Sequence, residues 1–428
     1  MPSPSGSPPG APRHFTGRRT LLLAAGAAGL GAPALLAQTP PRVVVVGGGF
    51  AGATCARDLA AAGLAVTLVE PRAEYVACPF SNAVIAGLRQ MEQQRFSYAA
   101  LEANGLRRIA QPATGLEDGR VLLADGTTLP YDRLVLAPGI ELRFDAITGY
   151  DAAAAGRMPH AWQAGPQTLL LRQQLEAMPD GGVVAIAAPA NPFRCPPGPY
   201  ERASLIAHYL KTHKPRSKLL ILDAKDSFSK QRLFEAAWQA LYPGLIEWVS
   251  LSFGGNVTEV DAAEGVLVTE FGRHRADVAN VIPPQRAGAI ARVAGVTDAS
   301  GWCPVDPVTF ESRLRPGVHV VGDAAIGGAM PKSAFTANAQ ARACAAAVVA
   351  LLAGETPRPP KLINTCYSLL APDYGISIAG VYSPRNGLLA EVEGAGGISP
   401  ADAPPEIRAA EAAHAEGWFR VITQAVFG

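Results

Sequence analysis

The sequence has little charge and no excess of either sign. Charged residues make up 17% of its 428 residues, and 37 lysines and arginines against 36 aspartates and glutamates leave a formal net charge of +1. No basic surface is predicted, so nucleic acid is not expected as a partner. With 49% hydrophobic residues, the composition is typical of a globular chain and excludes a disordered one, and the length predicts more than one domain.

The six cysteines form no C-x-x-C pair and no C-x-x-C-H motif. This absence excludes a c-type haem on this chain, a zinc ribbon and an iron–sulfur run. The seven histidines show no metal-ligand spacing either. No metal site is therefore predicted.

Residues 1–37 have the features of an export signal. The pair Arg18 and Arg19 precedes an apolar run from Leu21 to Ala37 that glycine and proline interrupt. The run is shorter than the roughly 20 residues of a membrane-spanning helix, which favours a twin-arginine signal peptide over a transmembrane anchor. We expect export of the folded protein to the bacterial periplasm, where disulfides persist, and no membrane span after signal removal.

The first strand, expected over residues 42–46, leads into a dinucleotide-binding fingerprint. The spacing is G-x-G-x-x-G, at Gly47, Gly49 and Gly52. These glycines permit a tight turn and a close approach to a pyrophosphate, and the alanine-rich helix that follows points its N-terminus at the phosphates. A second strand ends at Glu70, placed to accept from a ribose hydroxyl. The combination favours a dinucleotide site over a glycine-rich turn in an unrelated α/β domain.

Two later strands favour FAD over NAD as the dinucleotide. One ends in Pro138 and Gly139, and the other ends in Gly322 and Asp323, a pattern that resembles the ribityl-binding aspartate of flavoproteins with two dinucleotide-binding domains. An ordinary turn aspartate is the alternative. A helix expected to begin around residues 331–335 would aim its N-terminus, with Lys332, at the flavin edge where reduction builds negative charge.

The middle of the chain lacks a second glycine fingerprint. The strand expected over residues 182–188 runs instead into a loop with five prolines, which cannot wrap a pyrophosphate, so NAD(P)H is not expected as the electron donor. The loop carries Cys195, just before a helix expected over residues 201–211. A stiff loop at a helix start can lower the pKa of a thiol and activate it, although a small buried cysteine is the alternative.

Glu201 is a candidate general base if the helix start folds it toward Cys195, and an exposed first-turn acid is the alternative. Cys55 and Cys344 lie in alanine-rich segments and are expected to be structural. The role of Cys303 stays undecided and leans toward a structural one.

Together these segments resemble the flavoprotein subunits of flavocytochrome c sulfide dehydrogenase, which are related to sulfide:quinone oxidoreductases. Besides the FAD motifs, the resemblance covers residues 75–82, 194–201, 330–335, 364–368 and 415–419. It implies an α/β, glutathione-reductase-like flavoprotein with two Rossmann-like dinucleotide-binding-type domains and a C-terminal α+β domain. The predicted FAD-binding domain is discontinuous, 42–150 and 288–356, with a second Rossmann-like domain over 151–287 and the C-terminal domain over 357–428.

The resemblance also implies the chemistry. Cys78 would hold FAD through a thioether, and Cys195 and Cys366 would form a redox-active disulfide that sulfide attacks, with a purely structural bridge as the alternative. Electrons would pass to FAD and then to a c-type cytochrome subunit in a heterodimer, which carries the haem. The candidate catalytic residues are Cys195, Cys366 and Glu201. The candidate cofactor-binding residues are Gly47, Gly49, Phe50, Ala51, Gly52, Glu70, Pro71, Arg72, Cys78, Asn82, Pro138, Gly139, Gly322, Asp323 and Lys332.

Two other functions stay open. A sulfide:quinone oxidoreductase usually needs an amphipathic membrane-surface tail, and the last helix, expected from about Pro405 to Phe427, has only a modest apolar face. A flavin-binding electron-relay subunit without sulfide turnover would not need all three cysteines that the resemblance assigns to FAD attachment and the disulfide.

Overall fold

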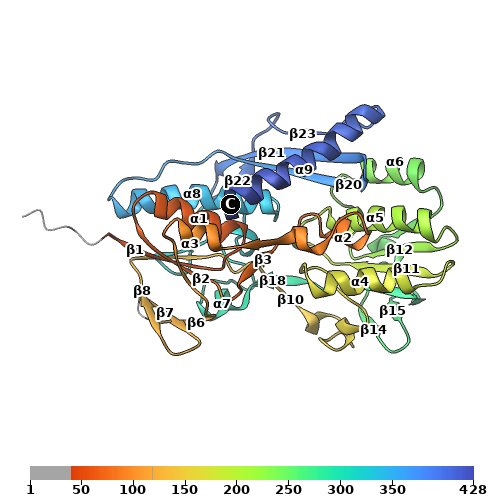
Figure 1. The fold of residues 1–428 in the computed structure, drawn as a ribbon, viewed down its shortest axis with the longest axis horizontal. Helices are drawn as coiled ribbons and strands as arrows, with labels where there is room; N and C mark the ends of the chain where they lie inside the picture. Colours follow the sequence, from red (N-terminus) through yellow and green to blue (C-terminus); the bar gives the residue numbers. More distant parts are fainter. Residues whose placement is uncertain (1–39, 118) are drawn as a thin grey trace, which may run out of the picture. The chain divides into compact units, whose positions relative to one another are not determined.

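The computed structural model describes residues 40–117 and 119–428 (Figure 1). The export signal expected over residues 1–37 lies outside the described residues. The strands and helices below are those that position the candidate site.

A five-stranded parallel sheet carries the first glycine motif. Its strands, in spatial order, are β19 (Val318–Val320), β9 (Arg133–Leu136), β1 (Arg42–Val46), β2 (Ala65–Val69) and β5 (Arg107–Ile109). In β1 four buried valines follow Arg42, which suits a strand covered on both faces. Because β19 pairs with β9, two segments far apart in the sequence share this sheet. The exact boundaries of the FAD-binding domain, 42–150 and 288–356, stay a prediction.

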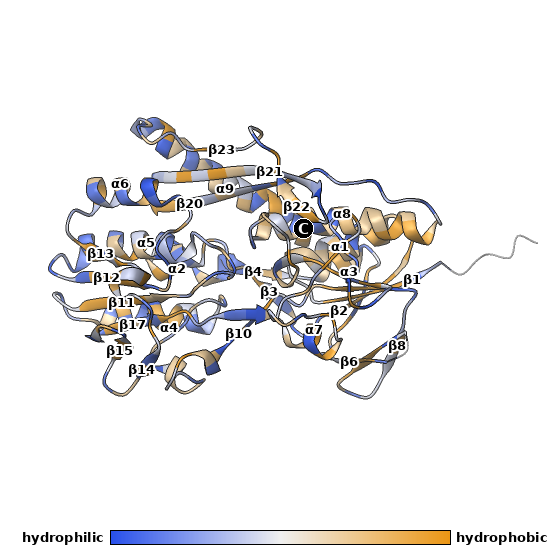
Figure 2. Cartoon of the chain, turned by 180° about the vertical axis from the view of Figure 1, so that it is seen from behind, coloured by the Kyte–Doolittle hydropathy of each residue, from blue (hydrophilic) through white to orange (hydrophobic). Residues whose placement is uncertain are grey.

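Two apolar helices, α1 (Phe50–Ala61) and α8 (Ala334–Leu352), pack against each other beside this sheet (Figure 1). The Ser333 side chain caps α8 by accepting a hydrogen bond from the Thr336 amide, and the helix begins at Ala334, within the predicted segment 331–335. Among the described helices, α8 has the length and composition of a membrane span, and Figure 2 shows its hydrophobic colouring. Part of this helix is buried in the structure, where α8 packs against α1.

The middle of the sequence forms a second parallel sheet, with four strands. Its strands, in spatial order, are β13 (Ile246–Val249), β12 (Lys218–Asp223), β11 (Val183–Ala188) and β17 (Val278–Val281), with the helices α4 (Pro166–Ala177), α5 (Gly198–His213) and α6 (Gln231–Leu241). The proline-rich loop joins β11 to α5. Since α5 begins at Gly198, with Pro199 and Glu201 in its first turn, the helix starts before the predicted residue 201.

The C-terminal part is a long antiparallel hairpin under a helix. It contains β20 (Leu362–Ala371), β21 (Tyr374–Arg385), β22 (Leu388–Glu391), β23 (Gly397–Ile398) and α9 (Pro405–Phe427). The bounds of α9 agree with those predicted. β20 contacts both α8 and α5 (Figure 1). The strand that carries Cys366 therefore lies against a helix beside the five-stranded sheet and a helix beside the four-stranded sheet.

Shorter elements complete the described chain. They are β3 (Glu74–Val76), α2 (Ser81–Ile85), β4 (Arg95–Ser97), α3 (Ala99–Ala103), β6 (Ala113–Glu117), β7 (Arg120–Leu123), β8 (Thr128–Pro130), β10 (Ile140–Leu142), β14 (Glu259–Asp261), β15 (Val266–Thr269), β16 (Gly272–Arg275), β18 (Gln285–Ala287) and α7 (Ala289–Val293). One hydrophobic core includes Val45 of β1, Ile186 of β11 and Phe419 of α9, so it joins the three parts just described.

Candidate functional site

The turn between β1 and α1 admits only glycine at two positions. Gly47 has φ 101°, and a Cβ atom there would lie 2.3 Å from the Ala137 carbonyl oxygen. A Cβ atom at Gly52 would lie 1.7 Å from the Gly47 carbonyl oxygen. The glycine spacing in the sequence therefore reflects steric requirements of this turn.

The helix that follows leaves its N-terminus available to an anion. The N-cap residue Gly49 provides no side-chain hydrogen bond, and no acidic residue lies in the first turn, which begins with Phe50 and Ala51. A Cβ atom at Gly322 would lie 3.0 Å from the Ala51 side chain. The glycine after β19 therefore lies close to the start of α1. These features fit the pyrophosphate of a dinucleotide.

Glu70 lies at the end of β2, beside the glycine turn, as predicted. Its carboxylate accepts hydrogen bonds from the Gly48 amide at 2.8 Å and from Arg72 Nε at 2.9 Å. Burial alone would raise the pKa of Glu70, but the contacts with Arg72 and Gly48 outweigh it and lower the pKa. The carboxylate is thus ionised and held in place, and its predicted contact with a ribose hydroxyl, like a role for the exposed Pro71, stays a prediction.

The loop after β9 also approaches the glycine turn. The Gly139 carbonyl accepts a hydrogen bond from the Gly288 amide at 3.0 Å, and a Cβ atom at Gly288 would lie 2.5 Å from the Pro138 carbonyl oxygen. Pro138 and Gly139 therefore lie where a chain segment from beyond residue 287 packs closely on them. This packing brings the two halves of the predicted FAD-binding domain together.

Arg194 connects three residues that the sequence proposed separately. Its Nη1 lies 3.9 Å from Asp323 Oδ2, and the charges of Cys78, Asp323 and Cys195 act on it. Burial would lower the pKa of Arg194, but these neighbours outweigh it and raise the pKa. Arg194 lies in the segment 194–201 that carries the family resemblance, and the sequence predicts no role for it.

Cys78 lies in the loop between β3 and α2 as a half-buried free thiol. Its Sγ lies 3.9 Å from the carbonyl oxygen of Trp162, which also accepts a hydrogen bond from Arg194. The indole Nε1 of Trp162 is buried and has no hydrogen-bond partner in the described structure. A buried donor without a partner, on a residue whose carbonyl group lies near Cys78, fits a bound polar group in this region.

Lys332 precedes α8 and does not extend from it. Its ammonium group donates hydrogen bonds to the carbonyl oxygens of Asp323 at 2.6 Å and Ala325 at 2.9 Å, and lies 3.9 Å from the centre of the Trp302 ring. Burial lowers its pKa to about 8. The helix begins at Ala334, within the segment 331–335 where its start was predicted, and Lys332 lies just before the Ser333 cap. A contact with the flavin edge stays a prediction.

Cys195 and Cys366, distant in the sequence, are brought together at the α5 end of the site. Both are free thiols in this structure. The Cys195 amide donates to the Lys332 carbonyl at 2.8 Å, which ties the proline-rich loop to the segment before α8. Cys195 has φ 59°, a conformation that is uncommon for a residue with a side chain.

The expected activation of Cys195 by a lowered pKa is wrong. Burial raises the pKa of the Cys195 thiol, and the negative charges of Cys366 and Glu201 raise it further. Burial also raises the pKa of Cys366, although the positive charge of Lys230 and a contact with Asn364 oppose it. Desolvation by the packed surroundings outweighs the helix dipole on which the expectation relied.

Glu201 turns inward, as the general-base hypothesis requires, and its charge acts on the Cys195 thiol. Asn82 Nδ2 donates to Glu201 Oε1 at 2.9 Å, while Asn82 Oδ1 accepts from Arg202 Nε at 2.9 Å. Burial raises the pKa of Glu201, against the opposing effects of Asn82 and Lys230. The alternative of an exposed surface acid is thus wrong. Asn82, predicted to bind the cofactor, is engaged with α5 in this structure.

Lys230 is a site residue that the sequence analysis missed. It precedes α6 with φ 61°, is 6% exposed, and donates hydrogen bonds to the Cys366 carbonyl at 3.0 Å and to Ser368 Oγ at 2.8 Å. Burial lowers its pKa, while the charges of Cys366, Glu201 and Cys195 raise it. Its place in the loop after β12 was the available signal, because loops at the carboxyl ends of neighbouring parallel strands meet.

The other three cysteines are fully buried: Cys55, Cys303 and Cys344. Burial raises the pKa of Cys303 to about 12, which disfavours the reactive thiolate. Within residues 40–117 and 119–428, no group of three His, Cys, Asp or Glu side chains is arranged to hold a metal ion.

Three family models match successive parts of the chain. Residues 41–164 match the pyridine nucleotide-disulphide oxidoreductase family. Residues 168–283 match the central part of the sulfide dehydrogenase [flavocytochrome c] flavoprotein chain, and residues 358–427 match the flavin-binding part of flavocytochrome c sulphide dehydrogenase.

Solved structures confirm the predicted fold class. The sulfide:quinone oxidoreductase of Aquifex aeolicus superposes with a TM-score of 0.70 at 18% identity, covering 90% of this chain and 92% of that one. The putidaredoxin reductase–putidaredoxin complex gives a TM-score of 0.64 at 19% identity, covering 90% of this chain and 93% of that one. Both share the α/β architecture of FAD-dependent reductases with a C-terminal domain.

Two characterised sequences are also similar. The mitochondrial sulfide:quinone oxidoreductase of Dictyostelium discoideum is 23% identical over 296 residues, which is 66% of this chain and 65% of that protein, so the match spans slightly less than two thirds of that relative. The sulfide dehydrogenase [flavocytochrome c] flavoprotein chain of Chlorobaculum thiosulfatiphilum is 60% identical over 45 residues, 10% of this chain and 94% of that sequence. The chain therefore belongs to the family of flavocytochrome c sulfide dehydrogenase flavoprotein chains.

Proposed function

We propose that this chain is the flavoprotein subunit of a periplasmic sulfide dehydrogenase, which oxidises sulfide at Cys195 and Cys366 and passes electrons through FAD to a c-type cytochrome subunit. The observation that carries the proposal is the convergence of these two thiols with Glu201 and Lys230 in one buried cluster. Family membership and the likeness to sulfide:quinone oxidoreductases support sulfide as the substrate.

FAD would be held by the glycine turn, by Glu70 and by Asp323, with Cys78 as the attachment point. When bound, FAD supplies a two-electron acceptor that can return electrons singly to a haem. The unpartnered indole N–H of Trp162 and the positive charge of Arg194, which acts on Cys78, are consistent with a polar ring system near Cys78.

The proposed reaction begins on the oxidised cysteine pair. A hydrosulfide ion attacks one sulfur of the Cys195–Cys366 disulfide, the S–S bond breaks, and the products are one cysteine persulfide and one cysteine thiolate. Return of the pair to the disulfide releases the added sulfur to a second hydrosulfide ion. The sum is two hydrosulfide ions giving one hydrogen disulfide ion, one proton and two electrons, for which FAD at this site would be the acceptor.

The surrounding side chains stabilise the thiolate and bind the released proton. Lys230, hydrogen bonded to the Cys366 carbonyl, stabilises a thiolate at Cys366. Glu201, with a raised pKa and the Asn82 amide on its carboxylate, can hold the released proton close to Cys195. The burial of Cys366 and the partial burial of Cys195 limit the access of water to the persulfide.

Anaerobic stopped-flow spectroscopy of the purified flavoprotein tests this proposal. Sulfide should bleach the flavin absorbance rapidly and NADH should not, because the loop after β11 lacks a glycine fingerprint. The variant Cys195→Ser should lose bleaching by sulfide, while Cys303→Ser, at a buried cysteine outside the pair, should retain it. Bleaching by NADH alone would contradict the proposal.

The electron acceptor and the location are tested separately. A cytochrome partner predicts co-purification of a c-type cytochrome with the full chain and reduction of its haem by sulfide. Twin-arginine export predicts periplasmic protein for the wild type and cytoplasmic protein when Arg18 and Arg19 are both replaced by lysine.

A quinone acceptor is the second candidate, favoured by the likeness to sulfide:quinone oxidoreductases. Against it, Phe419 and Phe427 of α9 are buried and contact aromatic side chains of the protein, including Tyr75. These residues are therefore not available to a membrane. Faster oxidation of the sulfide-reduced flavin by a soluble quinone than by the cytochrome would favour this candidate.

A further inference from the structure

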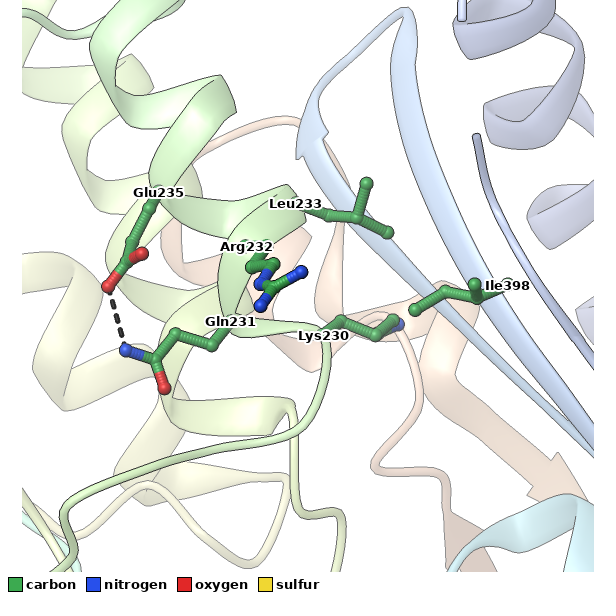
Figure 3. A pocket seen from close by; sticks show the side chains of 6 residues that line it. All are labelled: Lys230, Gln231, Arg232, Leu233, Glu235 and Ile398. Carbon is green, nitrogen blue, oxygen red and sulfur yellow. Dashed lines mark hydrogen bonds between the residues drawn. The ribbon is translucent and has the colours of Figure 1, made fainter. Parts of the chain in front are cut away.

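A cavity lies between the start of α6 and the short strand β23 (Figure 3). Its volume is about 410 Å³, and its lining residues are Lys230, Gln231, Arg232, Leu233, Glu235 and Ile398. Lys230 belongs both to this cavity and to the cysteine site, because its ammonium group donates hydrogen bonds to the Cys366 carbonyl and to Ser368 Oγ. The cavity therefore reaches the residue that contacts Cys366.

The charges around the cavity favour an anion. Lys230 and Arg232 are positive, and the carboxylate of Glu235 accepts a hydrogen bond from Gln231 Nε2 at 2.8 Å (Figure 3). A lysine ammonium group has three N–H donors, and the contacts of Lys230 with Cys366 and Ser368 use two of them. The third donor is available to a ligand.

The rest of the lining is apolar. Leu233 is almost fully buried, whereas the Ile398 side chain is 54% exposed and faces the cavity across from Lys230 (Figure 3). A ligand that fits must therefore combine a negative end with an apolar body.

The cavity is much larger than a hydrosulfide ion requires, so we expect a larger ligand. A single water molecule occupies about 30 Å³ of liquid volume, and a hydrosulfide ion is of similar order, far below the volume of this cavity. A linear polysulfide anion is longer, carries its charge at its ends and has an apolar sulfur chain between them.

We propose that this cavity binds a polysulfide anion, with one charged end at Lys230 and the sulfur chain against Leu233 and Ile398. The inference rests on the proposed function, for which it supplies the place where the sulfur product is held after release from the cysteine pair. It makes Lys230 a product-binding residue as well as a neighbour of Cys366.

Binding can be measured without turnover. Sodium tetrasulfide is titrated by calorimetry into the flavin-loaded protein carrying Cys195→Ser and Cys366→Ser, in which no thiol–disulfide exchange with the pair can occur. The proposal predicts saturable binding to one site. In the same background, Ile398→Trp, which fills the cavity from an exposed position, and Lys230→Gln should each weaken binding by at least about tenfold.

The matched control is Leu388→Trp, at a residue of β22 that is 49% exposed and does not line the cavity, and it should bind tetrasulfide as tightly as the background protein. Equal binding by the Ile398→Trp variant, equally tight binding of sulfate, or no binding of tetrasulfide would overturn the proposal. Each of these results is independent of whether sulfide bleaches the flavin of the wild type, so failure of this inference is distinguishable from failure of the proposed function.

Discussion

Asn82 of α2 donates a hydrogen bond from Nδ2 to the carboxylate of Glu201 in α5 at 2.9 Å. The same amide group accepts a hydrogen bond from Arg202 Nε, so one side chain joins the candidate proton acceptor to a buried guanidinium group. Arg202 also donates to the carbonyl oxygens of His160 and Ala161. The start of α5 is thereby tied to α2 and to the loop that contains His160 and Ala161.

Replacing Asn82 by Leu should change both the proton chemistry and the stability. Glu201 loses a donor that favours its ionised form, so its pKa should rise. The acidic limb of the pH profile for flavin reduction by sulfide should move to higher pH. Because Arg202 Nε is left without its partner in a buried place, the free energy of unfolding should fall by about 1 to 3 kcal/mol. An unchanged pH profile with reduced stability would assign Asn82 a structural role only.

Replacing Arg194 should lower both the reactivity of Cys195 and the rate of flavin reduction by sulfide. In Arg194→Met, the Cys195 thiol loses a positive charge that lowers its pKa, so alkylation of Cys195 in the reduced protein should slow at neutral pH. Flavin reduction by sulfide should slow by at least about tenfold. The control Arg216→Met alters an exposed arginine that pairs with Asp180 and should behave like the wild type. Equal alkylation rates in the two variants would contradict the assignment.

His160 predicts an acid-dependent loss of stability. Its Nδ1 accepts a hydrogen bond from the Trp162 amide at 2.9 Å, and burial together with the charges of Arg202 and Arg194 lowers its pKa to about 4. Between about pH 6.5 and pH 4 the unfolded chain binds a proton that the folded chain does not, so the free energy of unfolding should fall as the pH decreases.

The expected loss from His160 over this interval is about 2 to 3 kcal/mol. Urea denaturation between pH 7 and pH 4.5 should show this loss in the wild type and a smaller one in His160→Asn. Parallel pH dependences for the two proteins would show that His160 does not titrate as described.

Cys78 carries the prediction of covalent flavin. Wild-type protein precipitated with acid should keep its flavin fluorescence in the denatured chain, whereas Cys78→Ser should release free FAD into the supernatant. Cys55→Ser, at a buried cysteine outside the predicted cofactor contacts, serves as the control. Release of FAD from the wild type would contradict a thioether at Cys78.

The sequence predicted the parts of the site that depend on neighbours along the chain. Gly47, Gly52 and Glu70 were identified because a strand, a tight turn and a helix are local structures whose steric demands appear as residue spacing. The bounds of α9 were predicted for the same reason.

The sequence could not predict the surroundings that tertiary packing creates. Lys230 and Cys366 come from a loop and a strand that no spacing relates, and they meet because β20 packs on α5. The direction of the pKa shift of Cys195 was predicted incorrectly because it depends on burial, which only the packed structure defines.

The central claim is that Cys195 and Cys366 form the redox pair that sulfide attacks. The most direct measurement is mass spectrometry of the alkylated and digested protein, before and after one equivalent of sulfide under anaerobic conditions. The account predicts a disulfide-linked peptide pair containing Cys195 and Cys366 in the oxidised protein. After sulfide, that pair should be replaced by peptides in which one of the two cysteines carries an extra sulfur atom. Two free thiols in the oxidised, sulfide-reactive protein would contradict the account.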